Sequence, residues 1–217
     1  FFCSEIKGIK NIKTRKSEID NLKVQEFMQM QYCSGFGTIY KDIKRVIPGQ
    51  ILVIKKGKII KSLINELPEK KIISGFNDAY LDRCLKESIS SHLRSDVPYC
   101  IFFSGGIDSM LLLYYLKKLE KKNITAFSIF FNDSPSVHLE RLADQNKVNF
   151  ISEKFSESDF WNWIFFAAQK IDEPIADYAI LPTFKLASIA SKNFKVAITG
   201  EGGDELFGGY GRYKKTQ

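Results

Sequence analysis

Strand-like and helix-like stretches alternate along most of this chain, and that alternation constrains the fold more than any other feature. From about Asn77 onward, short apolar runs rich in Phe, Ile and Val are followed by stretches whose apolar residues recur at helical spacing. Strand-helix-strand order predicts parallel strands with helices on both faces. We therefore predict an α/β fold with a doubly wound parallel sheet. The expected strands are 99–103, 124–131, a short one near 150, and 194–199; the expected helices run from 77 toward Pro98, then 110–122, 137–147, 159–171 and 182–193.

The first 60 residues show a different sequence pattern from the rest of the chain. The stretch "RVIPGQILVIKKGKII" predicts two strands about a Lys-Lys-Gly-Lys turn, and "FFCSEIKGI" reads as a further short strand before an amphipathic stretch from Ser17 to Tyr32. So few elements make a poor core by themselves. We expect a β-rich remnant of another domain over residues 1–62, a polar linker near 65–74, and a main domain over residues 63–217.

Composition excludes several classes of protein. The 217 residues are 44% hydrophobic but contain no apolar run of the roughly 20 residues that a bilayer span needs, nor the pattern of a secretory signal, so we expect a cytoplasmic protein with no membrane partner. The net charge of +7 is spread over scattered lysines, which does not favour a nucleic-acid partner. The cysteines lack metal-site spacing and read as reduced structural thiols: Cys3, Cys33, Cys84 and Cys100.

A glycine-rich segment, "SGGIDS" at residues 104–109, joins the first strand of the main domain to a helix. Its glycines let backbone amides approach a ligand, and the amides, the serine hydroxyls and the positive end of the helix favour a phosphate. Asp108 would repel that anion unless a divalent cation such as Mg²⁺ lay between them. The segment is not a Walker loop, because the Gly-Lys-[Ser/Thr] ending is absent.

A second segment of the same kind, "TGEGGDELFGGYGRY" at residues 199–213, follows the last predicted strand. It places carboxylates among glycines, so we expect Asp204 to share the metal ion with Asp108 and Glu201 to act in proton transfer or in holding an amine. Each segment alone could be an ordinary glycine-rich turn with an acidic tip. Two of them at strand ends of one predicted sheet favour a binding site.

With these two segments, the chain resembles asparagine synthetase, the glutamine-dependent amidotransferase. The Ser-Gly-Gly-x-Asp-Ser loop is shared by many ATP pyrophosphatases, whereas "GEGGDELFGGY" is far more specific. The stretches "LKESISSHLRSDVPYCIFFSGGIDS" and "DEPIADYAILPT" extend the resemblance over essentially the whole chain. The resemblance implies the PP-loop ATP pyrophosphatase fold, which is of the adenine nucleotide alpha hydrolase-like type.

The same resemblance implies a function. Residues 1–62 are similar to the C-terminal part of the family's glutaminase domain, so the chain is expected to be a piece of a longer protein that is a possible homodimer. The implied reaction activates aspartate with ATP to an aspartyl adenylate, releases pyrophosphate, and then uses ammonia from glutamine. Carried over by position, Glu201 would be catalytic, Asp108 and Asp204 would bind Mg²⁺, and the nucleotide would be bound by Phe102, Ser104, Gly105, Gly106, Asp108, Ser109, Ile129, Thr199 and Gly200.

Other readings of the sequence stay open. A relative that adenylates another carboxylate would share the first loop but tends to alter the second, and a catalytically inert nucleotide-binding fragment would keep both. Asp172, Glu173 and Asp177 in "IDEPIAD" are expected either to help order aspartate or metal in the same cleft or to belong to an ordinary polar loop. The aromatic residues at 161, 163, 165 and 166 are expected in the core.

Overall fold

The computed structural model describes residues 1–12, 16–65, 77–120, 123–131, 137–211 and 213. They fall into two compact units. Unit 1 combines residues 1–74 with residues 165–180, and unit 2 combines residues 75–164 with residues 181–217. The domain boundary expected at residue 62 stays a prediction, and the polar linker lies outside the described residues except for Asn65.

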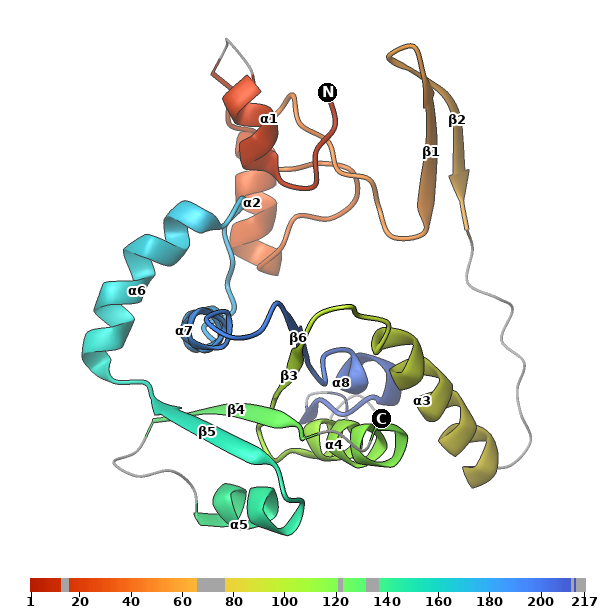
Figure 1. The fold of residues 1–217 in the computed structure, drawn as a ribbon. Helices are drawn as coiled ribbons and strands as arrows, with labels where there is room; N and C mark the ends of the chain where they lie inside the picture. Colours follow the sequence, from red (N-terminus) through yellow and green to blue (C-terminus); the bar gives the residue numbers. More distant parts are fainter. Residues whose placement is uncertain (13–15, 66–76, 121–122, 132–136, 212, 214–217) are drawn as a thin grey trace. The chain divides into compact units, whose positions relative to one another are not determined.

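A parallel sheet forms the centre of unit 2, as predicted. Its order is β5-β4-β3-β6, and every neighbouring pair is parallel (Figure 1). The strands are β3 (Tyr99–Phe102), β4 (Thr125–Phe130), β5 (Asn149–Lys154) and β6 (Val196–Ile198). All four were expected from the sequence, with ends that differ by a few residues.

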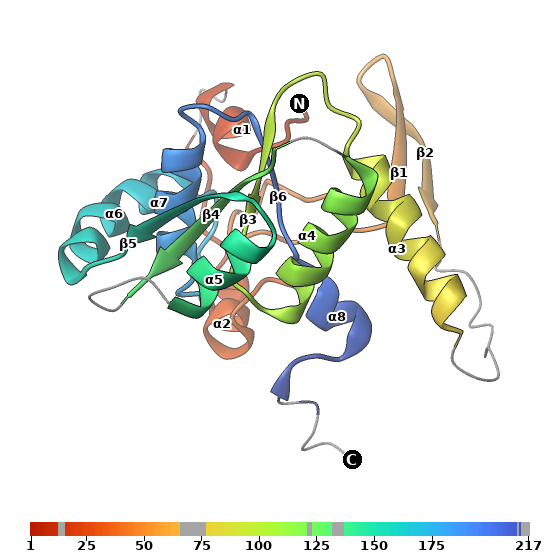
Figure 2. The same ribbon diagram turned by 60° about the horizontal axis from the view of Figure 1, so that its bottom comes forward.

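Helices cover both faces of this sheet, so the fold is doubly wound. One face packs on α4 and α5 through Ile101, Leu113 and Ala143, while the opposite face packs on α7 through Phe127 and Leu186 (Figure 2). This division follows from the alternation of side chains along each strand. The helices of unit 2 are α3 (Asp78–His92), α4 (Ile107–Leu119), α5 (Val137–Gln145), α7 (Ile180–Ala190) and α8 (Gly203–Phe207), and α6 (Glu157–Lys170) continues from this unit into unit 1.

Helix starts show what the sequence specifies locally. Asn77 caps α3, because its side-chain oxygen accepts a hydrogen bond from the backbone N–H of Tyr80 at 3.0 Å. Helix α4 begins at Ile107 and not at Met110, because Gly106 of the first glycine-rich loop is itself the N-cap. The last residues of the glycine-rich loop therefore form the first turn of α4.

Within the described residues, unit 1 contains helices α1 (Ile6–Ile12) and α2 (Asn21–Met30), a hairpin and the end of α6. Helices α1 and α2 precede the antiparallel strands β1 (Gln50–Lys55) and β2 (Lys58–Ile64). The hairpin confirms the two strands predicted about the lysine-rich turn. The buried residues of unit 1 lie outside the two N-terminal helices and the hairpin, at Cys33, Thr38, Ile39 and Ile43 and at Ala167 of α6.

Two expectations from the sequence are wrong. The strand expected in Phe1–Ile9 is absent, and helix α1 lies there instead because a carboxylate far along the chain satisfies its first amides, as shown below. The aromatic residues of α6 do not form a core: Trp161, Phe165 and Phe166 are exposed. Among the helices of the described residues, none combines the length and the apolarity that a membrane span requires.

Truncation of a buried leucine in α4 should destabilise unit 2. Leu113 is fully buried in the core, whereas Leu111 on the same helix is 41% exposed. We expect Leu113→Ala to lower the free energy of unfolding by about 2–5 kcal/mol, through lost burial and the cavity left behind. Leu111→Ala is the matched control and should change it by less than about 1 kcal/mol. Urea unfolding followed by circular dichroism measures both, and equal losses would contradict the assigned core.

Candidate functional site

The order of the strands reverses between β3 and β6. From β3 the chain adds β4 and then β5 on one side, and β6 returns to the other side of β3. In open α/β sheets, ligands bind beyond the carboxyl ends of the strands at such a reversal. The two glycine-rich loops follow β3 and β6, so both leave the sheet at this point.

The pairing register brings the two loops to the same level. Ile101 of β3 pairs with Ile198 of β6. Ser104 and Glu201 each come three residues after that pair, so the loops begin side by side. The sequence predicted two loops at strand ends, and the register adds that the strands are immediate neighbours.

The first loop makes a tight turn, and only glycine fits at its second residue, Gly105. Gly105 has φ +75°, and a Cβ there would collide with Cδ2 of Leu139. The hydroxyl oxygen of Ser104 accepts a hydrogen bond from the N–H of Gly106 at 3.3 Å and lies 3.3 Å from the hydroxyl of Ser109. Ser109 is buried, and its hydroxyl donates to the carbonyl of Gly106 at 3.0 Å.

The start of α4 is open to an anion. Its N-cap, Gly106, makes no side-chain capping bond, and both Ser104 and Gly106 are exposed. The first amides of a helix lack intrahelical partners and carry the positive end of the helix dipole. The arrangement suits a phosphate group held by backbone amides and hydroxyls.

The second loop packs directly on the first through its glycines. A Cβ on Gly200 would lie 2.9 Å from Cβ of Asp108 and 3.3 Å from the backbone nitrogen of Ser109. A Cβ on Gly203 would overlap the carboxylate of Asp108, with 2.7 Å to its Cγ. Asp108 is half-buried as a result. The glycines of the second loop thus make the room that the carboxylate of the first loop occupies.

Asp204 is held by the turn that follows α8. Its backbone carbonyl accepts a hydrogen bond from the N–H of Gly209 at 3.0 Å, and a Cβ on Gly209 would lie 3.1 Å from the Cγ of Asp204. The hydroxyl of Tyr210 donates to Glu205 at 2.6 Å across the same turn. Glu201 is exposed at the start of the loop, where it is accessible to a substrate.

Both glycine-rich loops carry carboxylates, a kind of side chain that can bind a divalent cation. Within the described ranges, His, Cys, Asp and Glu side chains form no group of three or more that could enclose a metal ion. Mg²⁺ in phosphate-transfer sites is usually held by one or two carboxylates together with phosphate oxygens and waters. Asp108 packs against Gly203, the residue before Asp204, so the two loops meet at this point; an ion shared by Asp108 and Asp204 stays a prediction.

The other predicted contact residues lie along the same strand ends. Phe102 ends β3 and Ile129 lies in β4, and both side chains pack toward the α7 face of the sheet. Contact of either residue with a nucleotide stays a prediction. Thr199 follows β6 directly and is exposed, with Gly200 behind it.

The four cysteines differ in burial. Cys33 and Cys100 are buried, Cys84 is half-buried, Cys3 is exposed, and all four are free thiols. Burial raises the pKa of the Cys100 thiol to about 11, and burial, with the nearby Glu173 carboxylate, also raises the pKa of Cys33. A raised pKa keeps the nucleophilic thiolate scarce at neutral pH.

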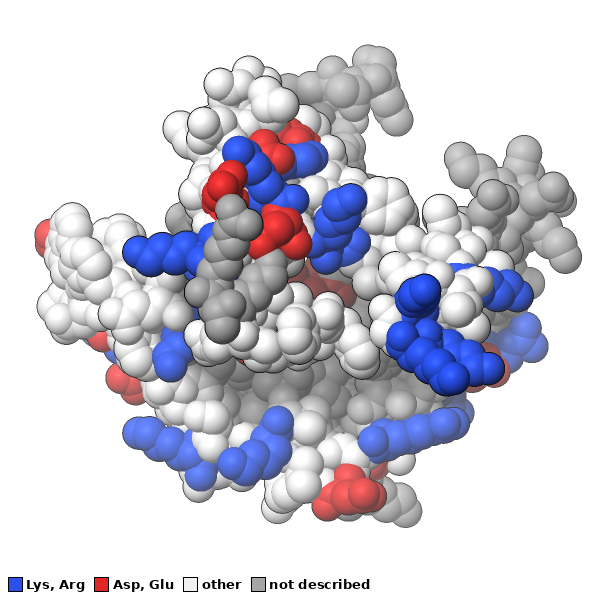
Figure 3. Space-filling model, turned by 90° about the horizontal axis from the view of Figure 1, so that it is seen from above, with Lys and Arg blue, Asp and Glu red and all other residues white. Residues whose placement is uncertain are grey.

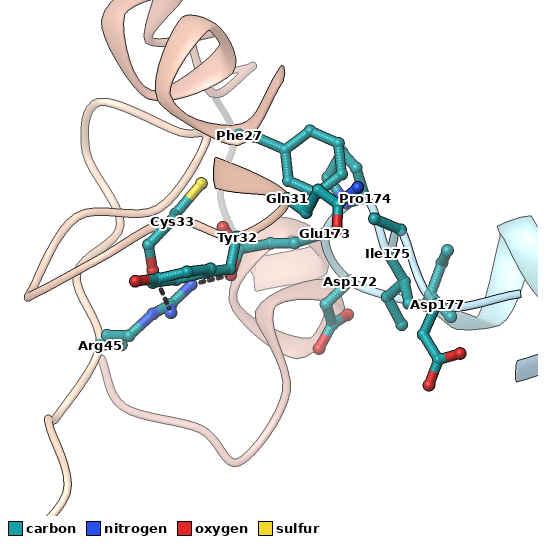
Figure 4. Close-up of a pocket in the computed structure, with 12 residues that line it drawn as sticks. Phe27, Gln31, Tyr32, Cys33, Arg45, Asp172, Glu173, Pro174, Ile175 and Asp177 are labelled. Carbon is teal, nitrogen blue, oxygen red and sulfur yellow. Dashed lines mark hydrogen bonds and ion pairs between the residues drawn. The ribbon is translucent and has the colours of Figure 1, made fainter. Parts of the chain in front are cut away.

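Asp172 and Glu173 bind residues of the N-terminal stretch. Both belong to unit 1, where they line an open cavity of about 490 Å³ together with Arg45 and Cys33 (Figure 4). Asp172 accepts from the N–H groups of Ile6 and Lys7, and Glu173 pairs with Arg45. The sequence did not predict these contacts, because residues more than 120 positions apart make them and no local pattern signals them.

Comparison with known proteins gives the family. Residues 80–217 match the family described as Asparagine synthase. Asparagine synthetase [glutamine-hydrolyzing] 1 of Bacillus subtilis is 30% identical over 99% of this chain and 35% of its own length. A Methanocaldococcus jannaschii protein whose name includes the same enzyme is 30% identical over 96% of this chain and 42% of its own. The chain therefore spans well under half the length of these relatives.

Among solved structures, an NH3-dependent NAD synthetase from Campylobacter jejuni aligns with a TM-score of 0.42 and 19% identity, over 63% of this chain and 62% of that one. That likeness is too weak to support an argument. The family match over 138 residues, together with relatives that align over nearly the whole chain, is decisive. This chain belongs to the asparagine synthase family.

Proposed function

We propose that this chain carries the ATP-dependent synthetase part of a glutamine-hydrolysing asparagine synthetase. The observation that carries the proposal is the close packing of Gly200 and Gly203 on Asp108 at the strand reversal. It joins a phosphate-binding loop to a loop that supplies carboxylates. Membership of the asparagine synthase family supports the same reaction.

In the proposed reaction, ATP binds along the ends of β3, β4 and β6. The backbones of Phe102 and Ile129 meet the adenine, and Thr199 with Gly200 contacts the nucleotide. The amides and hydroxyls of residues 104–109 hold the phosphates that leave as pyrophosphate. This division agrees with the exposed N–H groups at the start of α4 and with the inward packing of both strand side chains.

The chemistry requires positioning and charge neutralisation and no protein nucleophile. A carboxylate oxygen of aspartate attacks the α-phosphorus of ATP, and the bond to pyrophosphate breaks to leave an aspartyl adenylate. Ammonia then attacks the carboxyl carbon, Glu201 accepts a proton from the nitrogen, and AMP leaves with the carbon–oxygen bond electrons. Asp108 and Asp204 would hold Mg²⁺, which supplies charge neutralisation to the phosphates when bound.

We further propose that residues 1–62 are the end of a glutaminase domain that supplies the ammonia. The partners are then small molecules: aspartate, ATP, and ammonia from glutamine. Figure 3 shows Lys and Arg side chains in several groups on one face, and the absence of a nucleic-acid partner stays a prediction. A homodimer and a cytoplasmic location stay predictions.

One assay tests the reaction. The protein expressed from its complete reading frame is incubated with Mg-ATP, ammonia and one carboxylate at a time, and pyrophosphate is measured. We expect release that depends on aspartate. Release only with another acid would indicate a relative of different specificity, and nucleotide binding without turnover would indicate an inert binding module. Either result would overturn the assignment.

Replacement of the proposed base separates binding from chemistry. In Glu201→Gln we expect Mg-ATP to bind with unchanged affinity, because the exposed side chain holds none of the phosphate-binding groups in place. Asparagine formation should fall by about 10²–10⁴-fold, the usual contribution of a general base. Calorimetry and amino-acid analysis measure the two quantities. Unchanged turnover would remove Glu201 from the mechanism.

Crowding the contact between the loops should weaken nucleotide binding. Gly203→Ala places a methyl group against the Asp108 carboxylate, and such overpacking costs about 1–3 kcal/mol. If that cost falls on the nucleotide-bound state, Mg-ATP affinity should fall by about 5- to 150-fold. Gly211→Ala is the matched control, because a Cβ there meets no atom within 4 Å. Calorimetric titration of both variants checks the difference. An equal affinity in the two would show that the packing of the loops does not shape the site.

A further inference from the structure

Two adjacent carboxylates fasten the segment before α7 to the N-terminal stretch. Residues 165–180 lie inside the region that matches the Asparagine synthase family, yet they cluster with residues 1–74 in unit 1. The chain therefore leaves the nucleotide-binding unit within α6 and re-enters it with α7. Asp172 and Glu173 make the contacts described next, which hold residues 165–180 to the N-terminal stretch.

Asp172 caps α1 from 165 residues away. Its Oδ2 accepts from the N–H of Ile6 at 2.8 Å and its Oδ1 accepts from the N–H of Lys7 at 3.0 Å. The ammonium group of Lys7 also donates to the carbonyl of Lys170 at 2.9 Å. Helix α1 has no acidic residue in its own first turn, so Asp172 supplies the negative charge that a helix start favours.

Glu173 binds the most buried part of the N-terminal stretch. Its Oε1 accepts from the N–H of Ile39 at 3.0 Å, and its Oε2 forms an ion pair with Arg45. Arg45 also donates to the carbonyl of Cys33 at 3.0 Å, so its guanidinium bridges two elements (Figure 4). Both side chains are largely withdrawn from water, with 36% of Arg45 and 21% of Glu173 exposed.

The far end of the segment leads directly into the sheet of unit 2. Asp177 accepts from the N–H of Ala179 at 2.8 Å at the start of α7. Helix α7 then packs through Leu186 and Ala190 against the buried cluster that contains Cys100 of β3 and Phe127 of β4. Residues 165–180 are thus bound to the N-terminal stretch through Asp172 and Glu173, and they continue directly into α7, which packs on the nucleotide-binding sheet.

We propose that Glu173 and Arg45 form a latch that couples the N-terminal, ammonia-supplying part of the protein to the synthetase part. This inference rests on the proposed function. Glu173 is a positioning residue, since its carboxylate is occupied by Ile39 and Arg45 and acts through them. The latch keeps ammonia transfer efficient, whereas the core of unit 2 alone maintains the adenylation site.

The test compares two nitrogen sources in the protein expressed from its complete reading frame. Glu173→Gln removes the charge of the latch but keeps an acceptor for the N–H of Ile39. We expect glutamine-dependent pyrophosphate release to fall roughly tenfold, a typical coupling between sites. Release with saturating ammonia should stay within about twofold of wild type, which is below that coupling range. Equal loss with both nitrogen sources, or no loss with glutamine, would overturn the latch.

Two further sets of variants separate the latch from simple instability. If Arg45 and Glu173 act through each other, the double variant Arg45→Gln/Glu173→Gln should lose no more than either single variant. Glu18→Gln is the matched control, because the ion pair of Glu18 is with Lys41 at 3.1 Å in the same unit and involves none of residues 165–180. Additive losses, or an equal effect of Glu18→Gln, would contradict the proposal.

Hydrogen exchange distinguishes failure of the latch from failure of the proposed function. If wild type releases no pyrophosphate with aspartate and either nitrogen source, the proposed function fails, and exchange still tests the contact. Glu173→Gln should then accelerate amide exchange in residues 38–45 relative to Glu18→Gln. Unchanged exchange in those residues would overturn the latch whatever the enzyme activity.

Discussion

The packing of Gly200 and Gly203 on Asp108 is the contact on which the site depends. Glycine permits it, because a side chain at either position would strike the carboxylate or the first turn of α4. It places a carboxylate beside the exposed amides of a helix start, two features that attract ions of opposite charge. A nucleotide that carries its own divalent cation satisfies both at once.

Much of this fold could be predicted from the sequence because its signals are local. The apolar strands alternate with helical periods, and Asn77 stands where α3 needs a cap. Both glycine-rich loops were also evident, since each directly follows an apolar run. Their packing against each other depends on β6 pairing with β3 and not with β5, which the alternation alone does not specify.

The features that the sequence did not reveal depend on distant residues. Helix α1 receives its cap from Asp172, so the first residues read as a strand when considered alone. Glu173 and Arg45 are 128 positions apart, and neither lies in a motif that announces the other. The exposure of Trp161 also escaped prediction, because an aromatic-rich helix normally indicates a core.

The most direct test of the site is a crystal structure of the protein with ATP and Mn²⁺, in which anomalous scattering locates the metal ion. The account predicts one ion bound to phosphate oxygens at the ends of β3 and β6, with carboxylate oxygens of Asp108 and Asp204 both at about 2 Å or one water away. An ion bound elsewhere, or carboxylates too far apart to share it, would contradict the account.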